Sequence, residues 1–433
     1  MIQALPNGLE YTYETLLCST SSRYPTRLAE IKTLLGCLAC ALSPLSAVQL
    51  SEILAMKPGE RFLDFEAVTT DPYDALETIA PFIVIDHGGG FVKLFHYSLV
   101  EYLSSESILQ GPAKDFHVDI KSVSAWLTSI CLQYLTFSIF DTPLVSSPQE
   151  AHLEYLDTTQ SYTFYGYAAS NWFKHMRVTG GLSNYQQRYK PYLDLFVDGA
   201  DGPPCYARWQ QYPFVEEGSY SPICFAIWAD LTELVDHLLP MLSSVDCYFA
   251  DGFTCLTVAA RWNRAATARK LLGLGASIDK PESRRRLTPL HLSAEFACTE
   301  VFDLLLDSGA NPHAVTHKGT TPLYRAARGG SIHILKRLKD HGCDVNSRTF
   351  DNWTPLMEAV ERGHEEVVGL LLEWGADLHV CSDEGLAVLS LAKNLSCPTI
   401  LQKIQCALGS STASPGETME SGEEADLEPG ETR

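Results

Sequence analysis

The sequence predicts a mostly α-helical protein in which a helical N-terminal region with one β-hairpin precedes a solenoid of helical repeats. One pattern of residues returns about every 33 positions from residue 219 to residue 408. Residues 1–110 combine apolar residues at helical spacing with one hairpin signature. A period of this length indicates stacked units, each too small to bury its apolar face alone.

The residues of the repeated pattern predict where the helices of each unit begin and end. Thr288, Thr321 and Thr354 each precede Pro-Leu, so the threonine is placed to cap a helix whose first residue is proline. A second apolar run follows and ends at glycine, as at Gly309 and Gly375, which is typical of a helix C-terminus. Each unit is therefore predicted to be a helix, a short turn, a second helix and a projecting turn.

The copies differ in quality along the chain. Three strong copies occupy residues 287–383, and a fourth at 252–284 has Cys255 in place of the proline. Degenerate copies at 219–251 and 385–408 complete the array, and weak terminal copies are expected because the ends of a solenoid must face water. The spacing and the Thr-Pro-Leu-His signature resemble those of ankyrin repeats, which implies a stack of five to six units.

The first 110 residues predict three helices and a hairpin. Apolar residues at helical spacing run from Ile31 to Leu42, and amphipathic helices are expected at Ser46–Met56 and Tyr73–Ala80. Two apolar strands, residues 82–86 and 91–95, flank the turn His-Gly-Gly-Gly. Three helices followed by a hairpin describe a winged-helix-like region.

Four regions follow from these signals. We expect a winged-helix-like region at 1–110, a helical region and connector at 111–218, the repeats at 219–408 and an acidic tail at 409–433. The tail contains seven acidic residues, one basic residue and few apolar ones, so it is expected to be disordered.

Several motifs follow one another in the front half: Leu5-Pro6, Ser43-Pro44-Leu45, His96–Leu103, Cys131–Leu135 and Tyr167–Trp172 with His175. Together they resemble the region that follows the nucleotide-binding domain in fungal NACHT–ankyrin proteins of the NLR-like (STAND) class. That resemblance covers roughly residues 5–180 and implies a signalling ATPase. The chain contains no Gly-x-x-x-x-Gly-Lys-Ser/Thr loop, so the NACHT P-loop domain is taken to be absent, and nucleotide-driven switching is not expected of this chain.

Charge, hydropathy and cysteine content limit the kinds of partner and the cellular compartments expected for this chain. The net charge of −21 argues against nucleic acid as a partner, because neutralising phosphates requires clustered Lys and Arg. The longest apolar stretch, Leu34–Leu45, is too short to span a bilayer, and the start of the chain does not resemble a signal peptide. Thirteen scattered cysteines fit reduced thiols, so we expect an intracellular, cytoplasmic protein, with a nuclear location left open.

No catalytic, cofactor or metal site is expected. One Cys-x-x-Cys without a second pair indicates core packing, a His, Ser and Glu within six residues fit helix capping, and three glycines fit a hairpin tip. By the ankyrin resemblance, the histidine of Thr-Pro-Leu-His is structural. The residues in question are Cys37, Cys40, His96, Ser98, Glu101, Gly88–Gly90, His291 and His364.

A partner is expected on the projecting turns and the exposed ends of the first helices, because packing does not occupy these positions. Aromatic residues and arginines are common there, and such residues dominate interface hot spots. The alternative is that some of the aromatics pack against adjacent turns. Charge also changes sign along the array, from seven basic and two acidic residues in 318–350 to one basic and eight acidic in 351–383. The candidate partner-binding residues are Phe253, Trp262, Arg284, Arg285, Phe296, Lys318, Arg328, Phe350, Trp353 and Glu361.

These observations predict a non-catalytic scaffold or adaptor that binds another protein through the concave surface of the repeats. Two alternatives remain open at this point. One is a regulatory fragment of an NLR-like signalling ATPase, which would be either a remnant or an incomplete gene model. The other is an accessory protein of a fungal biosynthetic gene cluster.

Overall fold

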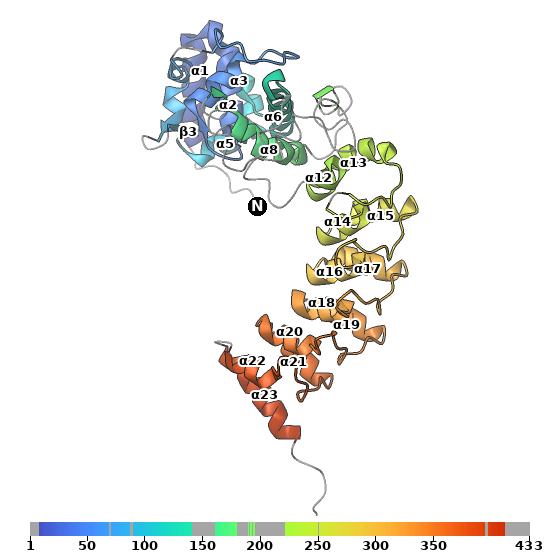
Figure 1. The fold of residues 1–433 in the computed structure, drawn as a ribbon. Coiled ribbons are helices and arrows are strands. Elements are labelled where there is room, and N and C mark those ends of the chain that lie inside the picture. The colour runs from blue at the N-terminus through green and yellow to red at the C-terminus, as the bar shows by residue number, and fades with distance from the viewer. Residues whose placement is uncertain are drawn as a thin grey trace, which may run out of the picture. The chain divides into compact units, whose positions relative to one another are not determined.

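The computed structural model describes residues 8–68, 71–86, 90–140, 161–179, 189, 191–192, 194, 221–249, 251–394 and 397–411. The fold is mostly α-helical, as the sequence predicts, with one small sheet near the N-terminus (Figure 1). The chain divides into two compact units, Met1–Arg284 and Arg285–Arg433, so the division falls within the repeats.

The N-terminal region of the first unit is built of helices joined by short turns. Its α-helices are α1 (Leu9–Arg23), α2 (Leu28–Cys40), α3 (Ala47–Ala55), α4 (Asp74–Glu77), α5 (Tyr97–Leu103), α6 (Ile120–Leu135) and α8 (Tyr165–Val178). Its 3-10 turns are η1 (Pro25–Arg27), η2 (Ala80–Phe82), η3 (Ser107–Gln110), η4 (Lys114–Phe116) and η5 (Ser138–Phe140).

The first two predicted helices are confirmed as α2 and α3. Ser46 caps α3 by accepting a hydrogen bond from the Gln49 N–H at 3.2 Å, and the Gln49 side chain accepts one from the Ser46 N–H at 2.9 Å. The third helix, α4, ends earlier than predicted, at Glu77. Pro81 follows closely, and proline disfavours α-helical geometry in the residue before it, so the chain continues into η2 instead.

The predicted hairpin is confirmed as β2 (Ile83–Ile85) and β3 (Phe91–Leu94), and the short strand β1 (Leu45–Ser46) joins it. The order is β1-β3-β2 and both pairings are antiparallel, with Val92 opposite Leu45 on one side and Ile85 on the other. Leu45 and Val92 are buried, so this face of the sheet packs against the helices. Residues 87–89 of the expected turn lie outside the described residues.

One buried carboxylate ties three parts of the N-terminal region together. Glu52 on α3 is only 3% exposed and accepts hydrogen bonds from the Tyr134 hydroxyl of α6, from the Thr163 N–H at 3.0 Å and from the Phe164 N–H at 3.1 Å. A buried charge is costly unless donors surround it, and these donors fix the position of α3 relative to α6 and to the start of α8.

The first unit continues into two helix pairs of the repeats through a series of aromatic ring contacts. Trp172 of α8 meets Phe225 with ring centroids 5.4 Å apart, and Phe173 meets Trp228 at the same distance. Trp228 in turn meets Trp262 edge to face at 6.1 Å. The elements of these pairs are α12 (Pro222–Trp228), α13 (Thr232–Leu238), η6 (Leu239–Met241), α14 (Cys255–Arg261) and α15 (Ala265–Gly273).

The second unit consists of helix pairs in two layers (Figure 1). The first helices of successive pairs pack on one another, and so do the second helices. The first helices are α16 (Pro289–Glu295), α18 (Pro322–Gly329), α20 (Pro355–Glu361) and α22 (Val388–Asn394). The second helices are α17 (Thr299–Asp307), α19 (Ile332–Asp340), α21 (Glu365–Glu373) and α23 (Pro398–Ser411).

The predicted helix ends are confirmed. The Oγ atoms of Thr288, Thr321 and Thr354 accept hydrogen bonds from the backbone N–H three residues on, at 3.2–3.4 Å, with proline as the first helical residue. Gly309 and Gly375 have φ values of +94° and +80° just after α17 and α21, a conformation that favours glycine. The sequence predicts that the acidic tail begins at residue 409, but α23 continues to Ser411, and residues 412–433 lie outside the described residues.

The inner helices α16 and α18 approach to backbone contact. A Cβ atom added at Gly329 would lie 2.6 Å from the carbonyl oxygens of both Ala294 and Glu295. Only a residue without a side chain fits at this crossing, so Gly329 sets the distance between the two helices.

Candidate functional site

Four projecting turns of the second unit form a continuous strip, which we call the tip strip: residues 285–287, 316–320, 349–353 and 382–386. Each turn after the first donates one backbone hydrogen bond to the turn before it. The bonds run from the His317 N–H to the Arg285 carbonyl at 3.3 Å, from Phe350 to Lys318 at 3.0 Å, and from Asp383 to Asp351 at 3.2 Å. The main chain therefore links each turn to the next.

A cleft of about 330 Å³ lies where the tip strip meets α18 and α20. Seven of its eleven lining residues are charged, and Tyr324 and Trp353 provide its aromatic surface. The lining residues are Arg285, Lys318, Thr320, Tyr324, Arg325, Arg328, Thr349, Asp351, Trp353, Glu358 and Glu361.

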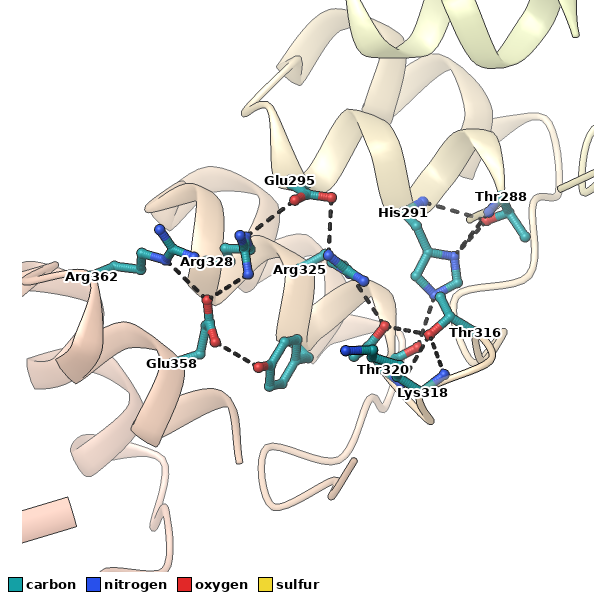
Figure 2. Close-up of polar contacts among 11 residues, drawn as sticks. Thr288, His291, Glu295, Thr316, Lys318, Thr320, Arg325, Arg328, Glu358 and Arg362 are labelled. Atoms are coloured by element: carbon teal, nitrogen blue, oxygen red, sulfur yellow. Dashed lines mark hydrogen bonds and ion pairs between the residues drawn. The ribbon is translucent and has the colours of Figure 1, made fainter. Parts of the chain in front are cut away.

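The floor of the cleft is held by the carboxylate of Glu358, which is 3% exposed (Figure 2). It accepts a hydrogen bond from the Tyr324 hydroxyl at 2.6 Å and pairs with the guanidinium groups of Arg328 and Arg362, each at 3.1 Å. Burial, and to a smaller extent the hydrogen bond to Glu358, raise the pKa of Tyr324. The phenol therefore remains a neutral donor at physiological pH.

A second carboxylate extends the network into the preceding repeat. Glu295 of α16 pairs with Arg325 and with Arg328, each at 3.1 Å, and Arg325 donates to the Thr320 Oγ1 at 3.2 Å (Figure 2). Burial lowers the pKa of Arg325, and the charge of Glu295 opposes that effect. Buried charges with several partners are rigid, so the floor presents a fixed surface across three repeats.

His291 supports the tip strip from below. Its Nε2 donates to the Thr320 carbonyl at 3.1 Å, and its Nδ1 accepts from the Thr288 hydroxyl at 2.8 Å (Figure 2). Burial lowers the pKa of His291 to about 4, so the ring is neutral near pH 7. This geometry is the structural role that the ankyrin resemblance implied.

The structure brings five of the ten candidate residues together. Arg285, Lys318, Arg328, Trp353 and Glu361 all line the cleft. These residues come from three successive repeats, and the sequence alone could place them only on the same side of the array.

Phe296 and Phe350 are exposed, at 47% and 72%, but do not line the cleft. The ring of Phe350 lies against the neighbouring turn, because a Cβ atom added at Gly319 would be 3.0 Å from it. Packing of this kind is the alternative that the sequence left open for the aromatic residues.

The other three candidates belong to the first compact unit. Phe253 and Trp262 are half-buried, and the guanidinium of Arg261 lies 5.7 Å and 5.5 Å from their ring centroids. Arg284 is exposed at the end of that unit. Part of the surface of Trp262 is taken up by Trp228, as described above.

The candidate residues include Arg328 of the floor but neither Arg325 nor Glu358. Arg325 and Glu358 occupy the helix position that holds Val258 and Leu292 in earlier repeats. A charge at a position that is otherwise apolar was the available signal, since a buried charge requires partners nearby.

The cysteine and histidine motifs considered above as possible reactive sites lie at buried positions or at the ends of helices. Cys37 and Cys40 are buried in α2, where burial raises the pKa of Cys40 to about 11. The hydroxyl of Ser98 lies 2.6 Å from the His96 Nδ1 and 2.6 Å from the Tyr13 hydroxyl, at the start of α5. His364 hydrogen-bonds the Arg328 carbonyl through its Nε2 at 2.9 Å.

Two further properties concern only the described part of the chain. Within it, no three His, Cys, Asp or Glu side chains gather in a way that could hold a metal ion. Within the same residues, no helix combines the length and apolar character needed to cross a membrane.

Comparison with known proteins identifies the repeats. The family model for ankyrin repeats (three copies) matches residues 223–316 and 290–380, so the C-terminal half contains ankyrin repeats. The chain is also similar to azaphilone pigments biosynthesis cluster protein L of Monascus ruber, with 29% identity over 183 residues. The similar segment covers 40% of this chain and 36% of that protein.

Proposed function

We propose that this protein is a non-catalytic scaffold that binds another protein through the cleft between the tip strip and helices α18 and α20. Ankyrin repeats support a role in protein–protein interaction. The observation that carries the proposal is the convergence of Arg285, Lys318, Arg328, Trp353 and Glu361 on one cleft. The paired charges of the floor are already ordered, which reduces the conformational cost of binding.

Trp353 is the residue to test first. We expect Trp353→Ala in the full chain to lose partners that the wild-type chain captures from cells of its source organism, because aromatic residues in clefts are frequent hot spots. Trp374→Ala is the matched control, since Trp374 is also half-buried but its ring faces Lys339 outside the cleft. Quantitative mass spectrometry of the captured proteins measures the loss.

Two controls sharpen this experiment. Circular dichroism and thermal melting of both variants show whether the fold is retained. Phe350→Ala then tests whether the site extends beyond the cleft to the exposed ring. Equal recovery of every partner by wild type and Trp353→Ala would remove the cleft from the proposal.

We further infer that residues 1–110 form a winged-helix-like region similar to that of fungal NACHT–ankyrin proteins. The order α2, β1, α3, α4 and the β2–β3 hairpin supports this inference. The corresponding alternative function is that of a regulatory fragment that acts with a nucleotide-binding chain. An ATP-binding protein among the partners captured by the chain would support that alternative.

A second candidate function is that of an accessory protein of a fungal biosynthetic gene cluster. Similarity to the cluster protein of Monascus ruber favours it. Deletion of the gene, followed by metabolite profiling, tests the idea. The expected result is loss or change of one secondary metabolite, and an unchanged profile would count against it.

A further inference from the structure

Resting on the binding role of the cleft, we propose that its ligand is an extended protein segment whose charges are segregated. One end of the segment carries carboxylates and the other carries basic side chains. The argument combines the order of charges along the tip strip, the pairing of charges in the floor and the length of the strip.

Charge changes sign in one direction along the tip strip. The first two turns carry Arg285, Arg286 and Lys318, and the next two carry Asp351 and then Asp383 and Glu384, all at exposed positions. The backbone hydrogen bonds between successive turns fix this order. A segment lying along the strip therefore meets cations at one end and carboxylates at the other.

The charges of the floor and those of the rim have different roles. In the floor, Arg325 and Arg328 form ion pairs with Glu295, and Arg328 also pairs with Glu358 (Figure 2). At the rim, Lys318 and Glu361 form no ion pair with any residue in the described ranges. The rim charges are therefore the ones available to a ligand, and they come from successive repeats, Lys318 from the turn before α18 and Glu361 from the end of α20.

The dimensions of the strip suit a short extended chain. Packed helices lie about 8–10 Å apart, so four successive turns span roughly 24–30 Å. At about 3.3 Å per residue, that length corresponds to roughly seven to nine extended residues. The cleft volume of about 330 Å³ accommodates a few side chains in the middle of the segment, next to Trp353.

Synthetic peptides test the proposal with the full-length chain. The probes are a block peptide, Asp-Glu-Asp-Ala-Leu-Ala-Lys-Arg-Lys, and a peptide of the same composition with alternating charges. A third probe is a synthetic copy of residues 417–431, which is acidic throughout. We expect fluorescence anisotropy to show the block peptide binding on the order of tenfold tighter than the alternating one at low salt. The difference should shrink as ionic strength rises.

Charge reversal at one end of the strip provides a gain-of-function test. Arg285→Glu with Lys318→Glu reverses two of the three basic side chains of the strip, so its charges become mainly acidic. We therefore expect roughly tenfold weaker binding of the block peptide and new binding of Lys-Arg-Lys-Ala-Leu-Ala-Lys-Arg-Lys. The matched control is Lys336→Glu with Lys339→Glu, which makes the same change in net charge at exposed positions of α19. The control should bind the block peptide as the wild type does.

Three results would overturn the proposal. They are equal affinity for the block and alternating peptides, equal effects of the two double variants, and tighter binding of the 417–431 peptide than of the block peptide. The last result would assign the cleft to the acidic segment of the chain itself. If peptides are not discriminated but Trp353→Ala still abolishes partner capture, the charge-segregated ligand is wrong while the scaffold function stands.

Discussion

At the scale of single residues, Glu358 decides how the floor of the cleft is organised. Its carboxylate accepts a hydrogen bond from the Tyr324 hydroxyl and forms ion pairs with the guanidinium groups of Arg328 and Arg362. All three donors would lose their common acceptor if it were removed. The cost of removing Glu358 therefore comes mainly from the hydrogen-bond donors left without an acceptor, and less from the loss of buried side-chain area.

We expect Glu358→Ala to lower the free energy of unfolding by about 1–3 kcal/mol, because the Tyr324 hydroxyl stays buried without its acceptor. The partly exposed arginines can turn to water, which limits the loss. Glu361→Ala on the same helix is the control and should change stability by less than about 0.5 kcal/mol, since Glu361 is exposed. Urea unfolding measures both, and equal effects would contradict the role of the network.

His291 predicts a dependence of stability on pH. Its pKa is about 4 in the folded chain and about 6.5 when unfolded, so between these values the unfolded chain binds the extra proton. Stability is therefore lost as pH falls from 6.5 towards 4, by about 3 kcal/mol in total for this group. Urea unfolding between pH 7 and pH 4.5 shows the loss.

Comparison with His291→Gln isolates the contribution of that ring from those of the carboxylates and of His175, whose pKa burial also lowers to about 4. We expect the variant to be less stable at pH 7, because its contacts with Thr288 and Thr320 are altered. Its stability should then fall less steeply with decreasing pH. Parallel curves for the two chains would show that the ring does not titrate in this range.

At the scale of elements, the sequence predicted the ends of helices better than the contacts between them. Threonine before proline, and glycine after an apolar run, act through local hydrogen bonds and local backbone geometry, so their positions are visible in the chain itself. The pairing of Glu295 with Arg325 and Arg328 depends on how neighbouring helices are placed. Only the charges at an otherwise apolar helix position hinted at it.

Substitution by alanine at two helical glycines is expected to change the stability of the fold in opposite directions. Gly329→Ala should destabilise the chain by about 1–3 kcal/mol, because the new Cβ meets two backbone carbonyls of α16 that cannot move aside. Gly369→Ala should stabilise it by about 0.5–1 kcal/mol, since only the flexible end of Lys403 lies near, at 3.5 Å. Thermal melting of the two variants in parallel would contradict this account if both shifted in the same direction.

At the scale of the whole molecule, the sequence could not predict where the compact units divide. The repeat period runs through Arg284 without interruption, whereas the first unit is extended by rings of α8 that meet α12. Aromatic residues far apart in the chain give no sign of which partner they stack on. The period located the repeats, and only the structure could show which of them share the N-terminal core.

The net charge of −21 makes a prediction about nucleic acid. We expect the full chain not to retard a 20-base-pair duplex at about 0.15 M salt, because non-specific affinity requires basic side chains that neutralise several phosphates. A gel-shift assay with the Arg285→Glu/Lys318→Glu variant as a second sample makes the test specific to the basic end of the strip. Salt-sensitive binding by the wild type that the variant loses would contradict the prediction.

The main-chain links between successive turns have an evolutionary consequence. Since hydrogen bonds of the backbone hold Arg285, Lys318 and Asp351 in series, those side chains can be exchanged without dismantling the scaffold beneath them. If the strip binds a partner as proposed, mutations at these exposed positions can change which partner is bound with little effect on the stability of the fold. Such a surface can drift quickly to new targets, and it can also be rewritten in the laboratory by grafting other side chains onto the same turns.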